Sequence, residues 1–350
     1  KITNVMIHIF SVIVLFILFF RALAFLGIDG RVAFFSSLLM ALFWGVHPLQ
    51  VSSVLYVVQR MQTLATFFLL LALLIYFDLR IANIDGRIGV WQIFGVVFFW
   101  FMALGCKEDA ILLPIYTLLL DFFIFRFYSA NPVVSYILKW AYFVFCLVVI
   151  IVFSLWVIPA YWGMEKFSGR DFSAYERILT QGRVLVDYLE QIFLPAEYKF
   201  KFYYDDYNPS RDWFNPPGTF FAWVFLSCLI LFSCFLGGCS KLFPLGVFVF
   251  FCGHLITSNI INLELVFEHR NHFPLIGCAL IFGAVIVFFS EKNSWKFLVP
   301  ILFFGWVVWL SVLAYDRAKI WGDSLRFSEY SVGLSPNSAR AWLVLCGTYY

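Results

Sequence analysis

Charged side chains are scarce in this chain. Asp, Glu, Lys and Arg make up 13% of the 350 residues, whereas an average soluble domain uses about 25%. So little charge cannot cover a surface that meets water on all sides, and the composition excludes an ordinary soluble domain. The net charge is only +3, and no basic run indicates nucleic-acid binding.

Paired cysteines and alternating strands are also missing. The eight cysteines form no Cys-x-x-Cys pair, and most stand in apolar runs, where cysteine is typical of a small buried hydrophobe. No set of His, Cys and acidic residues has convincing metal-ligand spacing, so no metal site is predicted. The apolar runs are continuous rather than alternating, which excludes a transmembrane β-barrel.

Most of the chain consists of hydrophobic residues instead. Hydrophobic residues make up 63% of the chain and the mean hydropathy is +0.90. About 20 apolar helical residues cross a bilayer core of roughly 30 Å, and the sequence predicts an all-α polytopic membrane protein with about ten spans. These lie near residues 5–25, 32–49, 55–79, 88–105, 110–126, 137–160, 218–237, 242–261, 272–290 and 296–315.

Basic residues gather in the short connections on one side of these spans. They are Arg21, Arg31, Arg80, Arg87, Arg126, Lys139, Lys241, Lys292 and Lys296. The positive-inside rule makes this side cytoplasmic. The alternate connections are then external, and they hold three polar outcrops: His47 to Arg60, Lys107-Glu108-Asp109, and Glu268-His269-Arg270. Charged side chains at the end of a membrane-spanning helix are costly to desolvate and usually serve a substrate, an ion or a partner.

The outer segment 161–217 is the one long stretch predicted not to span. Residues 174–193 place Ile178, Leu185, Leu189 and Ile192 on one helical face and charges on the other, which predicts an interfacial helix on the membrane surface. An extended aromatic strip follows and ends at Tyr204, Asp205 and Asp206, which are candidate contacts for an acceptor or a sugar.

The chain becomes polar and helical after Tyr315. Trp342, Leu345 and Tyr349 have the spacing of a tetratricopeptide helix, and Pro336 ends the helix before it. One helix and a fragment cannot bury a solenoid face alone, so more repeats are expected to follow. The predicted organisation is a transmembrane domain over 1–315 and the start of an outer tetratricopeptide region over 316–350.

Four motifs occur in an order that resembles a known family. They are Lys1 to His8, Gly45 to Val51 with Tyr56 to Met61, Lys107-Glu108, and Glu264 to Asn271. With the transition to a tetratricopeptide region, the chain resembles bacterial relatives of the transmembrane-and-tetratricopeptide O-mannosyltransferases of the GT-C superfamily. It departs from their pattern at His272, where Tyr is common, and at Asn262, where Pro is common. These departures leave the donor sugar open.

The resemblance implies an inverting glycosyltransferase of the bacterial inner membrane with its active face in the periplasm. Such an enzyme transfers a sugar from a polyprenyl-phosphate donor to a hydroxyl of an extracytoplasmic protein, which the tetratricopeptide region helps to bind. The family's catalytic acid lies in a first outer loop, which we expect to precede Lys1. No cofactor is predicted, and metal dependence is open.

A lipid-phosphate donor needs cations at headgroup depth, because the departing phosphate develops negative charge. The predicted phosphate-binding residues are Arg60, Lys107 and Arg270, and the predicted catalytic residues are His269 and Glu268. The predicted supporting residues are His47, Gln59, Glu108, Asn4 and His8.

Simpler structural interpretations compete with these roles. In these interpretations, Lys107 and Glu108 form an ion pair at the end of a span, and Arg60 is an interfacial side chain. His47-Pro48 ends a helix, and the imidazole bonds a free backbone carbonyl. Asp121 reads as a helix-end charge and His8 as a core histidine.

Competing functions are a lipid-linked oligosaccharide transferase, a lipid-sugar transporter and a non-enzymatic membrane scaffold. A transporter is expected to show midplane charges and internal repeats, whereas here the charges gather on one face.

Overall fold

The computed structural model describes residues 1–162, 169–238, 240–290 and 298–349, and this part is helical with no strand. The helices in the first half are α1 (Ile2–Phe25), α2 (Gly30–Gly45), α3 (Gln50–Leu55), η1 (Val57–Gln59), α4 (Arg60–Ile84), α5 (Val90–Leu104), η2 (Glu108–Leu112), α6 (Leu113–Leu120), η3 (Asp121–Phe125), α7 (Pro132–Val152), η4 (Phe153–Val157) and α8 (Ile158–Tyr161). Those in the second half are α9 (Ala174–Phe193), η6 (Glu197–Lys199), α10 (Gly218–Leu236), α11 (Leu242–Gly253), η7 (Glu268–Asn271), α12 (Leu275–Ser290), α13 (Leu298–Gly322), α14 (Ser324–Leu334) and α15 (Ala339–Tyr349).

Five described segments are long and apolar enough to cross a membrane: Ile2–Phe25, Val57–Ile84, Pro132–Tyr161, Gly218–Leu236 and Leu298–Gly322. The prediction of an all-helical chain is therefore confirmed for the described residues, which include five candidate membrane-spanning helices. Four further apolar helices, α2, α5, α11 and α12, have 10–17 residues, so a count of ten crossings stays a prediction.

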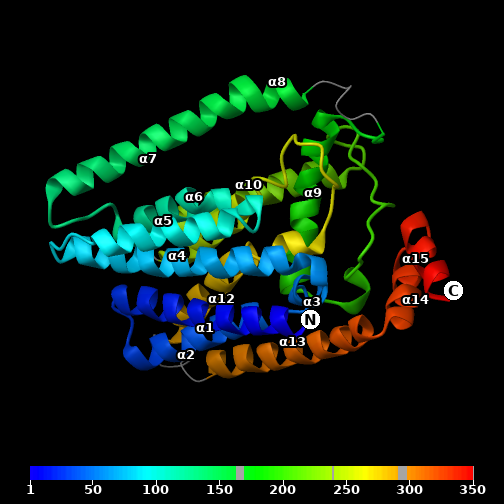
Figure 1. The fold of residues 1–350 in the computed structure, drawn as a ribbon, viewed down its shortest axis with the longest axis horizontal. Coiled ribbons are helices and arrows are strands. Elements are labelled where there is room, and N and C mark those ends of the chain that lie inside the picture. The colour runs from blue at the N-terminus through cyan, green and yellow to red at the C-terminus, as the bar shows by residue number, and fades with distance from the viewer. Residues whose placement is uncertain (163–168, 239, 291–297, 350) are drawn as a thin grey trace.

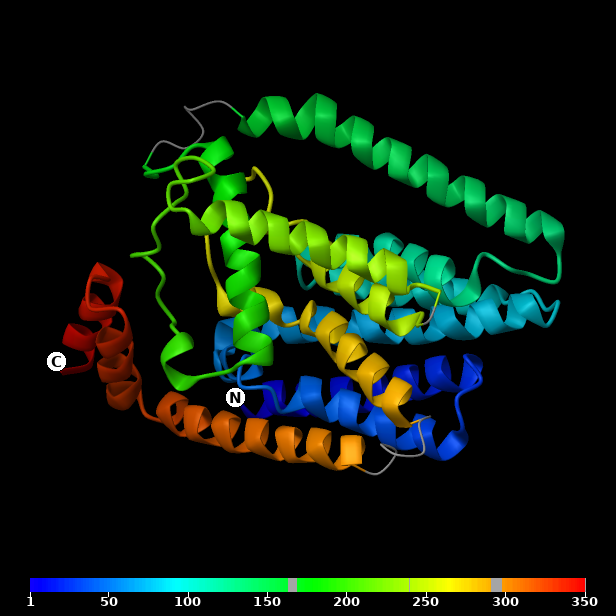
Figure 2. The same cartoon turned by 180° about the vertical axis from the view of Figure 1, so that it is seen from behind.

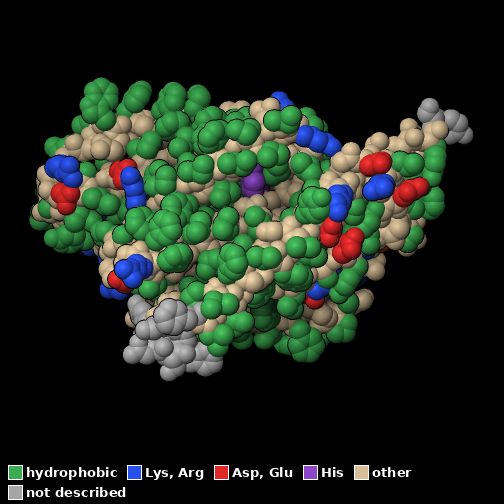
Figure 3. Space-filling model, turned by 90° about the horizontal axis from the view of Figure 1, so that it is seen from below, with side chains coloured by type: hydrophobic (Ala, Val, Ile, Leu, Met, Phe, Trp, Pro, Cys, Tyr) green, Lys and Arg blue, Asp and Glu red, His purple; other side chains and the backbone are tan. Residues whose placement is uncertain are grey.

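The helices lie side by side along the long axis, and their connections alternate between two ends (Figures 1 and 2). We call the end with α3, α9, α14 and α15 the loop end. The predicted basic connections that the structure describes lie at the opposite end, whereas Lys292 and Lys296 fall outside the described residues. Charged side chains gather near both ends and leave a broad apolar band between them (Figure 3), as a bilayer requires.

Local signals fix the ends and the packing of these helices. Asp29 caps α2 by accepting from the backbone N–H groups of Arg31, at 3.0 Å, and Val32, at 3.3 Å. Helices α11 and α12 approach closely at Gly246 and Gly277, where an added Cβ on either glycine would lie 2.4 Å from the other's carbonyl oxygen. Two glycines at the crossing therefore allow backbone contact that any larger residue prevents.

The opposite end contains a buried ion pair where a helix-end charge was predicted. Arg80 Nε donates to Asp121 Oδ1 at 2.7 Å, and both side chains are fully buried. Tyr76 also donates to Asp121, and the Tyr142 hydroxyl of α7 lies 2.7 Å from that of Tyr76. Asp121 does stand at a helix end, as the C-cap residue of α6. The prediction did not include its burial in an ion pair, which arises because α4, α6 and α7 converge there and exclude water.

Helix α9 stands across the loop end of the bundle (Figure 1). Ser173 and Glu176 form a capping box at its start. The apolar face predicted for this helix packs inside the protein. Leu185, Leu189 and Ile192 are buried in the protein core rather than in a membrane surface.

The polar face of α9 differs from the prediction at Arg177, which is fully buried. Its guanidinium donates to the carbonyl oxygens of Asn259 and Thr257, each at 2.8 Å, and of Leu263. These carbonyls are free because α11 ends at Gly253, eight residues before the predicted span end. The irregular segment after α11 thus needs a buried donor, which α9 supplies.

The polar C-terminal region forms the helix pair α14 and α15, which extends beyond the bundle (Figure 2). Asp323 caps α14, and the Tyr349 hydroxyl donates to Glu329 at 3.0 Å. Trp342 of the predicted tetratricopeptide spacing is 48% exposed. The pair is one helical hairpin, so a tetratricopeptide solenoid stays a prediction.

Candidate functional site

The three polar outcrops lie together at the loop end. Gln50 at the start of α3 contacts His272 directly after η7, and Lys107 before η2 lies close enough to lower the pKa of His269. Segments separated by more than 150 residues therefore form one cluster.

Arg270 organises the loop that carries this cluster. Its guanidinium donates to the carbonyl oxygens of Glu264, at 2.8 Å, and Leu265, at 3.2 Å, and lies 5.1 Å from the centre of the Phe267 ring. The side chain is buried, and burial lowers its pKa. These contacts give Arg270 a structural role beside its predicted role in phosphate binding.

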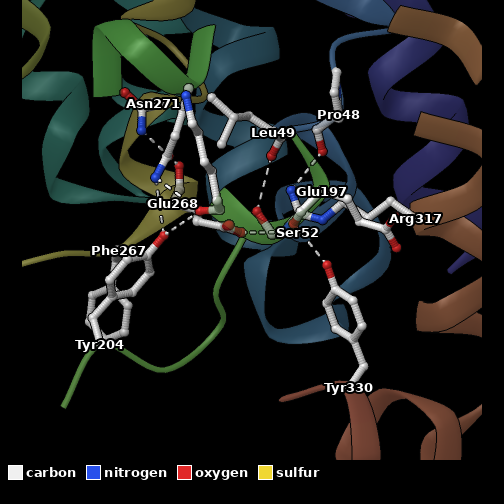
Figure 4. Close-up of polar contacts among 12 residues, drawn as sticks. Pro48, Leu49, Ser52, Glu197, Tyr204, Phe267, Glu268, Asn271, Arg317 and Tyr330 are labelled. Carbon is white, nitrogen blue, oxygen red and sulfur yellow. Dashed lines mark hydrogen bonds and ion pairs between the residues drawn. The ribbon is translucent and has the colours of Figure 1, made fainter. Parts of the chain in front are cut away.

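Glu268 forms a buried ion pair with Arg317 of α13 (Figure 4). The two side chains are 3% and 5% exposed, and Arg317 also donates to the Pro48 carbonyl at 3.0 Å. Burial raises the pKa of Glu268, while Arg317 and Ser52 oppose this shift. The pair ties η7, the start of α3 and α13 together, a contact between distant segments that sequence reasoning missed.

Lys107 binds Gln62 of α4 and lies 3.4 Å from Asp109 Oδ2. The predicted pair with Glu108 is wrong, because the backbone at Lys107 is extended and the turn that follows brings residue 109 back towards it while Glu108 stays exposed. Burial raises the pKa of Asp109. Lys107 therefore stands in a polar, poorly hydrated setting at the edge of the cluster.

His8, Trp44 and His272 pack their rings against one another at tilted angles in the interior of the cluster. The His8 ring centre lies 4.8 Å from that of Trp44 and 5.8 Å from that of His272. The Trp44 indole donates to the His272 carbonyl at 2.8 Å, and His8 Nε2 bonds the Gly45 carbonyl at 2.8 Å. His8 Nδ1 and His272 Nε2 are buried without a partner, so each imidazole offers one free nitrogen.

Other buried polar atoms beside the histidines also lack partners. Arg60 is exposed and donates from Nε to Asn4 Oδ1 at 3.0 Å, but Asn4 Nδ2 is unsatisfied. Gln50 Nε2 and Gln59 Oε1 are unsatisfied as well. A buried polar group without a partner costs about 1–3 kcal/mol, which makes this cluster a candidate binding site for a polar ligand.

His47 has the structural role that the His-Pro sequence predicts. Its Nδ1 accepts from the Leu49 N–H at 3.2 Å, and its Nε2 therefore donates to the Ile192 carbonyl at 3.0 Å. The side chain is fully buried, and burial lowers its pKa to about 3. His47 thus anchors the end of α9 to the bundle.

The aromatic strip makes intramolecular contacts at its predicted sugar-binding residues. Asp205 binds Ser338 and Arg340 of the C-terminal helix pair. Asp206 lies 3.7 Å from Lys201, and the buried Tyr204 hydroxyl accepts from Gln191 Nε2 at 3.3 Å. Asp205 therefore helps to hold α15 against the outer segment.

Sequence reasoning assigned no role to several residues that the fold brings into the site: Trp44, Gln50, Gln62, Asp109, Arg317 and, except as a departure from the family pattern, His272. Asp109 and His272 adjoin predicted residues, and this adjacency was the available signal.

Among the described residues, no group of three or more His, Cys, Asp or Glu side chains could hold a metal ion. Comparison with protein-family models, curated proteins and solved structures finds no match to this chain.

Proposed function

We propose that this chain is an integral-membrane glycosyltransferase that moves a sugar from a polyprenyl-phosphate donor to a hydroxyl of an extracytoplasmic protein. The observation that supports it is the set of unpartnered buried polar atoms of Asn4, His8 and His272, beside the cations Arg60 and Lys107 at one end of an apolar bundle. A ligand with a polar head and a hydrocarbon tail fits this arrangement.

The donor phosphate binds between Lys107 and Arg60. Both side chains hold a neutral amide partner, Gln62 for Lys107 and Asn4 for Arg60, which positions them. Asp109 Oδ2 lies 3.4 Å from Lys107 Nζ and offsets part of the charge of Lys107. His269 is neutral, because burial first and then the charges of Lys107 and Arg270 lower its pKa to about 3. It therefore donates an N–H to a phosphate oxygen and stabilises the charge that develops as the sugar leaves.

The isoprenoid tail of the donor lies on the lipid-facing surface. The apolar cavity beneath Phe273 has a volume of about 50 Å³, which is too small for such a chain. Val57, Val58 and Met61 are exposed beside Arg60 and offer an apolar path that ends at the guanidinium.

The protein acceptor approaches across the outer segment and the C-terminal helices. Arg340 and Ser338 fix α15 to the strip at Asp205, so a polypeptide bound along α14 and α15 is held beside the loop end. Glu268 serves this reaction by holding η7 against Arg317 rather than by touching the donor.

Transfer in proteoliposomes tests the proposal. The purified full-length protein is given radiolabelled polyprenyl-phosphate sugars and a panel of secreted proteins, and incorporation into protein is counted. Lys107→Gln should lower transfer by about 10²-fold, the usual effect of removing one group that stabilises developing negative charge.

Lys319→Gln is the matched control, because Lys319 is an exposed lysine on α13 that pairs with Asp316 at 3.4 Å. It should transfer sugar at the wild-type rate. Equal activity of the two variants contradicts the phosphate-binding role of Lys107. Movement of labelled lipid across the vesicle membrane with no labelled protein identifies a transporter instead.

A further inference from the structure

A second polar hollow lies beside α9. Its volume is about 400 Å³, enough for a small oligosaccharide or peptide, and its walls come from α9, from residues 198–208 and from Val266. Arg183, Asp187, Glu190 and Gln191 line it at helical spacing, so they occupy one face of α9. Tyr188 does not line the hollow and bonds the backbone of Phe267.

Three tyrosines form the aromatic part of the wall: Tyr198, Tyr204 and Tyr207. The Tyr207 hydroxyl donates to Asp187 Oδ2 at 2.7 Å, and the Arg183 guanidinium lies 5.2 Å from its ring centre. These contacts hold Tyr207 rigidly, whereas Tyr198 is 67% exposed. In the hollow, the Tyr207 ring is thus fixed and the Tyr198 ring is accessible, and carboxylates lie beside them.

The charges that line the hollow balance. Three acidic residues, Asp187, Glu190 and Asp206, face three basic residues, Arg183, Lys199 and Lys201. Lys199 Nζ lies 2.8 Å from Glu190 Oε1, and Lys201 Nζ lies 3.7 Å from Asp206 Oδ2. Internal pairing of this kind gives no net attraction for an anion or a cation, but leaves many hydrogen-bonding groups for a neutral polar ligand.

Gln191 supplies an independent sign of a ligand. The side chain is 5% exposed, and its Nε2 donates to the Lys199 carbonyl at 3.2 Å and to the Tyr204 hydroxyl. Gln191 lines the hollow, and its Oε1 is buried without a partner. This oxygen can only accept, so the missing partner is a hydroxyl or an N–H.

From these observations we infer that the hollow between α9 and residues 198–208 is a binding site for a neutral saccharide. Hydroxyl groups of the sugar donate to Gln191 Oε1 and to the carboxylates, and the sugar ring packs on Tyr198. The inference concerns binding alone and does not depend on the proposed transfer reaction.

Calorimetric titration of the purified full chain in detergent tests this site without any lipid donor. The probes are neutral mannotriose and chitotriose, anionic trigalacturonic acid and the cationic glucosamine trimer. At least one neutral probe should bind, and neither charged probe should bind as tightly. Tyr198→Ala should weaken binding of the neutral probe by about tenfold, as expected for a central aromatic contact.

Tyr175→Ala is the matched control, because Tyr175 is 44% exposed on α9 and does not line the hollow. It should bind the neutral probe with wild-type affinity. The inference is overturned if no neutral probe binds, if a charged probe binds more tightly, or if the two tyrosine variants behave alike. Loss of transfer with intact saccharide binding contradicts only the proposed function.

Discussion

Buried imidazoles at the loop end are neutral at physiological pH, and this decides what they can do. Burial lowers the pKa of both His47 and His269 to about 3. A neutral imidazole donates one hydrogen bond and accepts another, so His47 can join Leu49 and Ile192. Protonation would remove the acceptor and place a charge in a dry interior.

Stability should therefore fall in acid. An unfolded histidine takes up a proton near pH 6.5, but folded His47 does so only near pH 3, so the unfolded state binds more protons between these values. The free energy of unfolding should drop by about 2 kcal/mol for each such histidine between pH 7.5 and pH 5. Urea unfolding in detergent at both pH values measures this loss.

His47→Asn separates titration from hydrogen bonding in this experiment. The Asn side-chain oxygen takes the place of the imidazole Nδ1 and can still accept from the Leu49 N–H, but the amide does not titrate. Its free energy of unfolding should lose about 2 kcal/mol less than wild type on acidification. An unchanged dependence on pH would falsify the assignment of His47 as a buried neutral group.

At the scale of elements, α4 and α6 are held together at the opposite end by polar contacts rather than by apolar side chains alone. Arg80 and Asp121 are fully buried, whereas Arg21 and Asp78 form a pair that is 40% and 41% exposed. A buried charge that loses its partner is far more costly than an exposed one.

Asp121→Ala should therefore destabilise the protein by about 3–5 kcal/mol, measured by thermal unfolding in detergent. Asp78→Ala, which breaks the exposed pair, should cost less than about 1 kcal/mol. The double variant Arg80→Met with Asp121→Ala should recover part of the loss, because no unpaired charge is then buried. Similar losses from the two single variants would argue against the buried pair.

At the scale of the whole molecule, the alternating connections define two ends with different chemistry. The loop end carries α9, the aromatic strip and the C-terminal helices, and the opposite end carries short connections rich in arginine. The positive-inside rule predicts that the opposite end is cytoplasmic. Tyr198 and Asp85 are exposed, one at each end.

Cysteine labelling tests this orientation. In a background with all eight cysteines replaced, Tyr198→Cys should react with a membrane-impermeant maleimide in intact spheroplasts. Asp85→Cys should react only after the membrane is disrupted. Labelling of Asp85→Cys in intact spheroplasts contradicts the predicted topology, and with it the periplasmic site.

The sequence predicted where the helices lie better than it predicted which side chains contact one another. The apolar runs located the long helices, and the polar outcrops contain His269, Lys107 and Arg60, whose roles stay predictions. It missed Arg317 as the partner of Glu268, which lies 49 residues away, and Gln50 as the partner of His272, 222 residues away. Hydropathy shows which residues avoid water, but it carries no information on which distant side chains meet.

By itself the sequence determined that this chain is helical and crosses a membrane, because so little charge can form no other stable surface. Only the tertiary structure decided what the polar and charged residues contact. It placed Arg270 and Arg177 on backbone carbonyls, Asp205 on the C-terminal helices, and Glu268 on Arg317. It left Asn4, His8 and His272 with unpartnered atoms. Burial and pairing are properties of neighbours in space, and the fold alone brings those neighbours together.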